Sequence, residues 1–153
     1  SVDDPIKLNR LIHDLEKIGK KFKTSFLFPV HPRTEKIIKK LSIKKLNFIK
    51  IIKPLEFLNF LTIMNNSRII FTDSGGIQEE ASLLGVPCIT IRETTERQLS
   101  LKNKNNILTG YDYTKILKAV TYFNRHSTNP SKIFGDGKVA ARIFNILKKI
   151  DNK

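Results

Sequence analysis

Short apolar runs alternate with longer amphipathic segments from one end of the chain to the other. The runs that predict strands are 25–30, 47–52, 68–71, 88–91 and 106–108, and the segments that predict helices are 5–21, 34–41, 55–64, 75–84, 97–101, 113–124 and 138–150. Apolar strands separated by helices are typical of a parallel sheet covered on both faces. With right-handed crossovers, this pattern predicts an α/β fold, a doubly wound, Rossmann-like sheet in a single domain over residues 1–153.

Polar residues follow several of these predicted strands directly. They are His31, Pro54 with the residues after it, Ser74 and Arg92. In an open parallel sheet, ligands bind beyond the carboxyl ends of the strands. We therefore expect these residues to converge on one edge of the sheet and to form a binding site there.

The segment 71–80 places two glycines between a predicted strand and a predicted helix. Gly75 and Gly76 allow a sharp turn and leave room for a ligand near the main chain. The free amides at the helix start, together with the helix dipole, favour a phosphate, and Ser74 adds a hydroxyl donor. The alternative interpretation, a glycine-rich turn whose neighbouring acids only complement the dipole, stays equally open on spacing alone.

Two adjacent carboxylates follow this turn. With Ile77, Ala81 and Leu84 on the buried face of the helix, Glu80 is predicted to lie on or beside that face and Glu79 to point away from it. A carboxylate one turn from a phosphate would repel it but could accept hydrogen bonds from a neutral diol. The segment therefore predicts a diphosphate on Ser74, Gly75 and Gly76 and a ribose on Glu80.

Several ordered blocks of the sequence resemble the non-hydrolysing UDP-N-acetylglucosamine 2-epimerases. The blocks are 28–34 (FPVHPRT), 54–58 (PLEFL), 72–81 (TDSGGIQEEA), 84–87 (LGVP), 92–97 (RETTER), 106–108 (NIL) and 134–138 (FGDGK). They follow the family's order and cover nearly the whole chain. After Arg97 the family usually has Pro-Glu, whereas this chain has Gln98-Leu99, so contacts to the substrate from that loop are less certain to carry over.

The resemblance covers only the C-terminal half of the family's usual length. Full-length members resemble two-domain glycosyltransferase-B proteins, in which this half holds the nucleotide and the N-terminal half supplies most acid and base carboxylates. The family carries a His-Arg-x-Glu-Asn motif at the domain junction, and residues 1–5 look like those that directly follow it. We therefore expect the chain to need an N-terminal domain or subunit, whether it is an excised or a separately encoded half.

The resemblance implies interconversion of UDP-GlcNAc and UDP-ManNAc. The family is thought to eliminate UDP, form a 2-acetamidoglucal, and add UDP back after protonation of C2 from the opposite face. It implies no metal and no redox cofactor, and a place in cell-surface polysaccharide synthesis. A cytoplasmic location is expected because the sequence shows neither a membrane-spanning run nor a signal-peptide pattern. Two alternatives stay open: a non-catalytic nucleotide-sugar-binding module, and half of a hydrolysing epimerase or of a glycosyltransferase-B enzyme. Besides a UDP-sugar and the N-terminal half, a second copy of the chain is a candidate partner.

The remaining site candidates rest largely on the same resemblance. It favours a nucleotide-side role for His31 and a direct or indirect role for Arg92 beside the sugar nucleotide. Phe57, for which a helical core position is the stronger interpretation, is the candidate to pack beside the base. His31 is also the one expected proton carrier in this half. The alternatives are a local cap for His31, a salt-bridged loop for Arg92, and a helical core position for Phe57. Arg33 is predicted either to bind phosphate or to tie loops together.

The net charge of +14 arises largely from two lysine runs in the first third of the chain. These lysines are 17, 20, 21 and 23, and then 36, 39, 40, 44, 45, 50 and 53. We do not expect nucleic-acid binding, because aromatic residues do not interleave with the lysines as a base-stacking platform requires. A solvated face and attraction of anionic substrates stay open. The single Cys88 lies in a predicted buried strand and is expected to be a core thiol. No apolar run is long enough to cross a bilayer.

Overall fold

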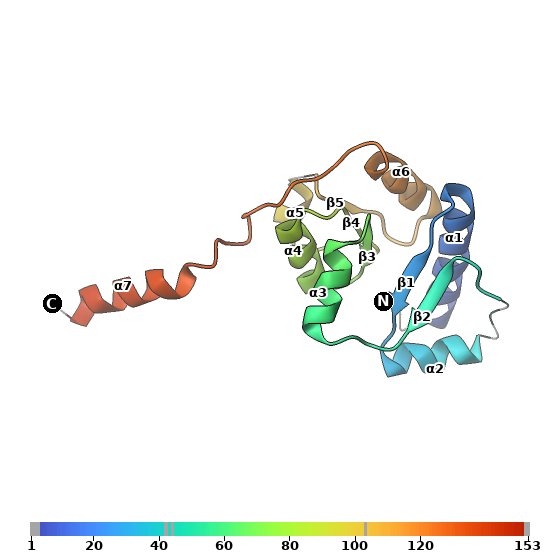
Figure 1. The fold of residues 1–153 in the computed structure, drawn as a ribbon, viewed down its shortest axis with the longest axis horizontal. Helices are drawn as coiled ribbons and strands as arrows, with labels where there is room; N and C mark the ends of the chain where they lie inside the picture. The colour runs from blue at the N-terminus through green and yellow to red at the C-terminus, as the bar shows by residue number, and fades with distance from the viewer. Residues whose placement is uncertain (1–3, 42, 44, 103, 152–153) are drawn as a thin grey trace.

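A computed structural model describes residues 4–41, 43, 45–102 and 104–151. The first three residues of the segment compared with the domain junction, and Lys44 of the second lysine run, lie outside this part. The elements follow in the order α1 (Pro5–Phe22), β1 (Phe26–Pro29), α2 (Pro32–Lys40), β2 (Ile49–Ile52), α3 (Phe57–Asn65), β3 (Ile70–Thr72), α4 (Gly75–Leu84), β4 (Cys88–Thr90), α5 (Gln98–Lys102), β5 (Asn106–Leu108), α6 (Tyr113–Phe123) and α7 (Val139–Asp151). Figure 1 shows this alternation, and it confirms the predicted α/β class.

Helix α1 illustrates how local signals define an element. The side chain of Asp4 caps its start by accepting hydrogen bonds from the amides of Ile6 and Lys7, at 2.9 and 3.2 Å. Pro5 occupies the first turn, where its missing N–H group costs nothing. The helix ends at Lys23, which adopts a left-handed conformation with φ of 51°. One face of the helix is apolar and buried, at Leu8, Leu11, Ile12, Leu15 and Ile18.

The strands are parallel and form two sheets instead of one continuous sheet. Strand β1 pairs with β2, and β3, β4 and β5 pair in that order. Between the two sheets, β1 and β3 meet through side chains, with the rings of Phe26 and Phe71 edge to face and their centroids 5.4 Å apart. A largely apolar cavity of about 530 Å³ lies between these two strands. The predicted parallel sheet is therefore present but divided at this point.

Helices cover the two faces of the β3–β5 sheet, as a doubly wound fold requires. The larger apolar cluster packs α1 and α6 against one face and contains Ile89 and Ile91. The smaller cluster packs α3 and α4 against the other face and contains Ile70 and Cys88. Neighbouring strand residues thus point into different clusters, because side chains alternate between the faces of a strand.

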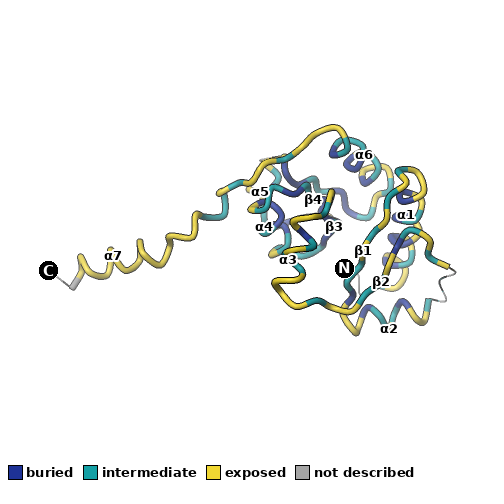
Figure 2. The backbone as a smooth tube through the Cα atoms, viewed as in Figure 1, coloured by how far each residue is buried: buried dark blue, intermediate teal, exposed yellow. Residues whose placement is uncertain are grey.

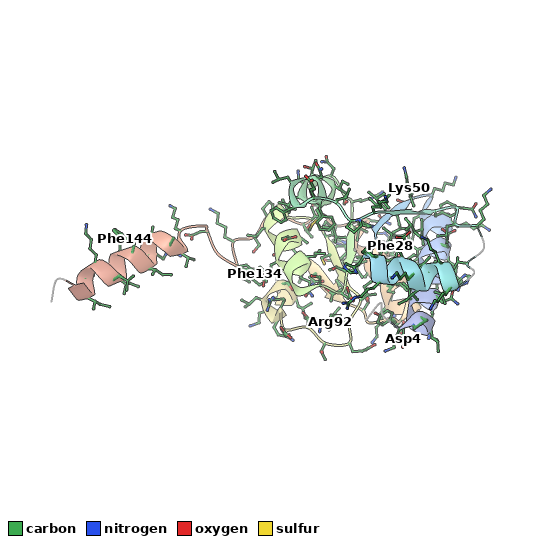
Figure 3. All side chains as sticks on the ribbon, turned by 90° about the horizontal axis from the view of Figure 1, so that it is seen from below. Asp4, Phe28, Lys50, Arg92, Phe134 and Phe144 are labelled. Carbon is green, nitrogen blue, oxygen red and sulfur yellow. The ribbon has the colours of Figure 1, made fainter. Side chains whose placement is uncertain are left out.

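Helix α7 projects away from the rest of the protein (Figure 1). The tube in Figure 2 is coloured as exposed along its described length. Its large apolar side chains are more than half exposed, at Val139, Ile143, Phe144, Ile146, Leu147 and Ile150. Phe144 is labelled on this helix in Figure 3. The sequence predicted the helix itself, but its apolar stripe does not join the core. No helix of the described residues is long and apolar enough to span a bilayer.

Candidate functional site

The parallel pairing places the polar strand-end residues at the carboxyl edges of the two sheets. In the larger sheet Thr72 stands opposite Thr90, so that Ser74 and Arg92 each follow two residues later at the same edge. In the smaller sheet Pro29 stands opposite Ile52, which places His31 and Pro54 at its edge. Val30, Asp73 and Ile91, which adjoin His31, Ser74 and Arg92, line the cavity between the sheets. Both carboxyl edges therefore border the same cavity.

The start of α4 presents hydrogen-bond donors that the protein itself does not use. Ser74 is the N-cap residue, with an extended backbone, and its hydroxyl makes no capping hydrogen bond. The amides of the first helical turn lack intrahelical acceptors. A β-carbon built on Gly76 would meet only the Ser74 Oγ atom, at 4.0 Å. The space in front of this turn is therefore open to a ligand.

Glu79 and Glu80 differ in their surroundings. Glu79, predicted to point away from the buried face of α4, is partly exposed and forms an ion pair with the Arg97 Nε atom. Glu80 is partly buried and has no hydrogen bond or ion pair within the described residues. Burial, and to a smaller degree the carboxylate of Glu79, raises the pKa of Glu80. An unpaired, partly desolvated acceptor one turn after the phosphate-binding candidates is suited to a diol.

His31 caps the start of α2. Its Nδ1 atom accepts a hydrogen bond from the amide of Arg33, at 3.3 Å, while the ring is exposed. The expected alternative, a cap, is therefore present, although the ring accepts from an amide and does not donate to a carbonyl. Because Nδ1 accepts, the neutral ring carries its proton on Nε2, which faces away from the cap and can donate to a ligand. The Arg33 side chain is exposed, with no ion pair within the described residues.

Two roles were considered for the charged loop 92–97, a ligand contact and a salt-bridged loop, and they belong to different arginines. The Arg97 guanidinium pairs with Glu79 and lies 3.8 Å from the Glu96 carboxylate, so the salt-bridged loop forms around Arg97. The partly buried Arg92, labelled in Figure 3, has no ion pair within the described residues. Its backbone carbonyl accepts from the amide of Gly110, at 3.1 Å, which fixes the backbone while leaving the guanidinium for a ligand.

Phe57 opens α3 and is 62% exposed, so the core position considered for it was wrong. An exposed aromatic ring near the carboxyl end of β2 is available to a planar ligand. Cys88, in contrast, is buried, and burial raises the pKa of its thiol to about 12. The expectation of a core thiol is confirmed. The lysines of the two runs are exposed wherever the structure describes them, as on a solvated face.

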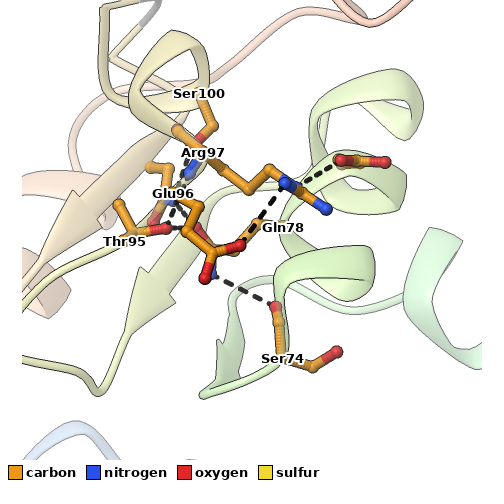
Figure 4. Close-up of polar contacts among 8 residues, drawn as sticks. Ser74, Gln78, Thr95, Glu96, Arg97 and Ser100 are labelled. Atoms are coloured by element: carbon orange, nitrogen blue, oxygen red, sulfur yellow. Dashed lines mark hydrogen bonds and ion pairs between the residues drawn. The ribbon is translucent and has the colours of Figure 1, made fainter.

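Sequence reasoning missed a buried polar cluster behind the glycine turn. Its centre is Gln78, which has no exposed surface although it is polar. Figure 4 shows Gln78 between the start of α4 and the loop that carries Thr95 and Arg97. In the sequence, the small residues Ala81, Ser82 and Gly85 are the signal that this face of α4 is buried. Small side chains mark the face on which a helix packs most closely. Of these, Ala81 and Ser82 are fully buried.

Comparisons with known proteins identify the family to which the chain is similar. A sequence profile of the family described as UDP-N-acetylglucosamine 2-epimerase matches residues 1–148. The chain is 44% identical over 147 residues to the UDP-N-acetylglucosamine 2-epimerase of Methanococcus maripaludis, covering 92% of this chain and 39% of that protein. It is 30% identical over 151 residues to the UDP-2,3-diacetamido-2,3-dideoxy-D-glucuronate 2-epimerase of Pseudomonas aeruginosa, covering 98% and 42%.

Among solved structures, the chain is similar to the Methanocaldococcus jannaschii UDP-GlcNAc 2-epimerase in complex with UDP-GlcNAc and UDP. The TM-score is 0.87 and the identity 38%, and the match covers 97% of this chain and 42% of that one. The chain thus spans about two fifths of the length of the relatives that it matches.

Proposed function

The chain belongs to the UDP-N-acetylglucosamine 2-epimerase family, and we propose that residues 1–153 form the single UDP-binding domain of an enzyme that interconverts UDP-GlcNAc and UDP-ManNAc. The observation that carries the proposal is the turn at Ser74–Gly76, whose donors are unused and whose front is open, with the unpaired Glu80 one helical turn further on. A nucleoside diphosphate needs amide donors for its phosphates and an acceptor for its ribose.

Each candidate residue then has a role set by its chemistry. The hydroxyl of Ser74 and the amides of Gly75 and Gly76 hold the diphosphate, helped by the α4 dipole. Glu80 accepts hydrogen bonds from the ribose hydroxyls. Arg92, Arg33 and the Nε2–H group of His31 supply further donors on the nucleotide side, and Phe57 packs beside the base.

The task of this half in the reaction is to stabilise the departing diphosphate. Charge accumulates on the β-phosphate as the C1–O bond breaks, and donors fixed before the reaction stabilise that charge without rearranging. Removal of the C2 proton on one face and its return on the other require two positioned acid or base groups. His31 is the candidate that this half can offer, so most of the proton transfer is assigned to the N-terminal half.

The proposed N-terminal domain or subunit has structural support in α7. This helix presents a row of exposed apolar side chains, and the chain spans about two fifths of the length of its relatives. Burial of such a row against another body is favourable by roughly 25 cal/mol per Å². A further copy of the chain is the second candidate for this contact. A cytoplasmic location and a role in supplying precursors for cell-surface polysaccharide are part of the same proposal.

Calorimetric titration of the purified chain tests the binding claim directly. We expect UDP and UDP-GlcNAc to bind and uridine to bind more weakly, because uridine lacks the diphosphate that the turn would hold. Equal affinity for uridine and UDP would contradict the phosphate site. Addition of the N-terminal domain of the Methanococcus maripaludis relative then separates the alternatives. UDP-ManNAc as the product would support the epimerase. Release of free UDP together with ManNAc would support a hydrolysing enzyme. Tight binding without turnover would support a non-catalytic module.

A further inference from the structure

A chain of buried hydrogen bonds connects the first turn of α4 to the loop between β4 and α5 (Figure 4). The Gln78 side chain donates through Nε2 to the carbonyl of Ser74, at 3.2 Å, and accepts at Oε1 from the Thr95 hydroxyl, at 2.8 Å. The Thr95 oxygen in turn accepts from the amide of Arg97, at 3.1 Å. The Gln78 side chain is therefore hydrogen-bonded both to Ser74, which caps α4, and to Thr95 in the loop that faces this helix.

A second connection lies beside the first. Glu79, the residue after Gln78, forms the ion pair with Arg97. The guanidinium of Arg97 lies along Gly75, because a β-carbon built on Gly75 would be 3.6 to 3.7 Å from three of its atoms. Residues 75, 78 and 79 of α4 therefore form one face toward this loop, at the three- and four-residue spacing of neighbours on a helix.

The far end of the network anchors the loop to the sheet. Asn106, at the start of β5, donates to the Gln78 Oε1 atom at 3.1 Å and to the Ser100 hydroxyl at 2.9 Å. It accepts from the Thr90 hydroxyl at 2.8 Å. Ser100 donates to the carbonyl of Arg97 at 2.7 Å. The buried amide groups of Gln78 and Asn106 are thus well supplied with partners, as low-dielectric surroundings demand.

The hydrogen bonds between α4 and the loop 92–97 are suited to precise positioning of the two segments. Directional hydrogen bonds fix both the distance and the angle between α4 and the loop. The site requires such precision, because a hydrogen bond to a phosphate oxygen weakens steeply when the donor tilts.

We propose that Gln78 and Thr95 are positioning residues of the nucleotide site. Their hydrogen bond fixes the orientation of the Ser74–Gly76 turn relative to the loop 92–97, so that the turn amides and the Arg92 guanidinium bind the diphosphate together. This inference rests on the proposed function of the turn. Neither side chain touches the ligand, since both are buried behind the turn.

Two variants of equal size in the same network separate positioning from general stability. Thr95→Val removes the hydroxyl that joins Gln78 to the loop. Thr90→Val removes the hydroxyl that bonds Asn106 from the opposite side, and Thr90 is as fully buried as Gln78 but contacts neither α4 nor the loop through that hydroxyl. Calorimetry of the full chain with UDP and with uridine, and thermal unfolding, are measured on both variants and on Thr95→Ser.

For Thr95→Val we expect UDP affinity to fall about 5- to 20-fold, in the range for a broken buried hydrogen bond. Uridine affinity should stay within about twofold, since the loss concerns the diphosphate alone. Thr90→Val should lower the unfolding temperature by about as much as Thr95→Val does, while its UDP affinity stays that of the wild type. Thr95→Ser, which retains the hydroxyl, should restore UDP binding. Equal UDP affinity in wild type and Thr95→Val, or equal losses in Thr95→Val and Thr90→Val, would overturn the proposal.

Amide hydrogen exchange without ligand keeps this inference distinguishable from the proposed function. Exchange at residues 75–77 and 95–97 should be faster in Thr95→Val than in Thr90→Val. A wild-type chain that binds no UDP would refute the proposed function, while unchanged exchange in Thr95→Val would refute the positioning role by itself.

Discussion

Glu79 forms an ion pair with Arg97 across the gap between α4 and the following loop. The next residue, Glu80, has no such partner within the described residues, although it is partly buried. Two identical side chains that are adjacent in the sequence therefore have different tasks: one holds the loop in place, and the other is available to a ligand.

This difference predicts unequal effects of two matched substitutions. Glu80→Gln should weaken UDP binding by about 1–3 kcal/mol, because a ribose hydroxyl would lose a charged acceptor. Glu79→Gln should cost less than about 1 kcal/mol, since the Glu79–Arg97 pair is about one third exposed and exposed ion pairs contribute little. Calorimetry with UDP measures both. Equal losses would show that the assignment of the ribose to Glu80 is wrong.

The raised pKa of Glu80 predicts a pH-dependent effect on stability. Because the folded state holds this proton more tightly than the unfolded chain, ionisation of Glu80 lowers the free energy of unfolding as the pH rises through the folded-state pKa. Glu80→Gln should therefore raise the melting temperature at pH 7 and have no such effect well below the ordinary pKa of 4.5. Thermal unfolding of both proteins at the two pH values checks this. An equal difference at both would contradict it.

The open space in front of Gly76 allows a test of the phosphate site that leaves the fold intact. A β-carbon at this position meets only the Ser74 Oγ atom, at 4.0 Å, so Gly76→Val should keep the melting temperature within a few degrees. It should nevertheless abolish UDP binding, because its methyl groups occupy the ligand's place. Leu83→Val, on the exposed side of the same helix, is the control for a β-branched residue in α4. UDP affinity retained in a folded Gly76→Val protein would contradict the assignment of the phosphate site to this turn.

Cys88 should be inert in the folded protein. Its thiol is buried, and a pKa of about 12 leaves almost no thiolate at pH 8. We expect no labelling by a thiol reagent at pH 8 in the native state and rapid labelling in urea, with mass spectrometry as the measurement. Native-state labelling as fast as in urea would show that the strand β4 is open to solvent.

Residues 1–153 alone should not epimerise UDP-GlcNAc at a measurable rate. His31 is the only candidate proton carrier among the strand-end residues assigned to the site, and one group cannot easily serve both faces of C2. Incorporation of deuterium at C2 in D₂O reports the proton transfer. We expect none from this chain and recovery when an N-terminal domain from a relative is added. Exchange by the chain alone that is lost in His31→Ala would overturn the division of labour between the halves.

Much of the fold could be predicted because its signals are local. The bounds of α4 and β5 agree with prediction at both ends. For α4 the reason is specific: Gly85, directly after the helix, adopts a left-handed conformation with φ of 73°. Glycine is the residue that allows such a helix end, so the stop could be placed from the sequence alone.

The parts that could not be predicted depend on contacts between distant residues. Gln78 bonds to Thr95 and Asn106, which lie 17 and 28 residues away, and a hydropathy pattern assigns a glutamine to the surface. The division between β1 and β3 likewise depends on how strands remote in sequence come together.

The exposed row of apolar residues on α7 affects the stability of the helix itself, besides offering a surface for a partner. A 13-residue helix without a packing surface is at the length where isolated helices are marginally stable in water. Its last turns should therefore exchange between helix and coil until a partner covers them. Amide hydrogen exchange of residues 139–151 should then slow on association, so this segment would report whether the two halves are in contact.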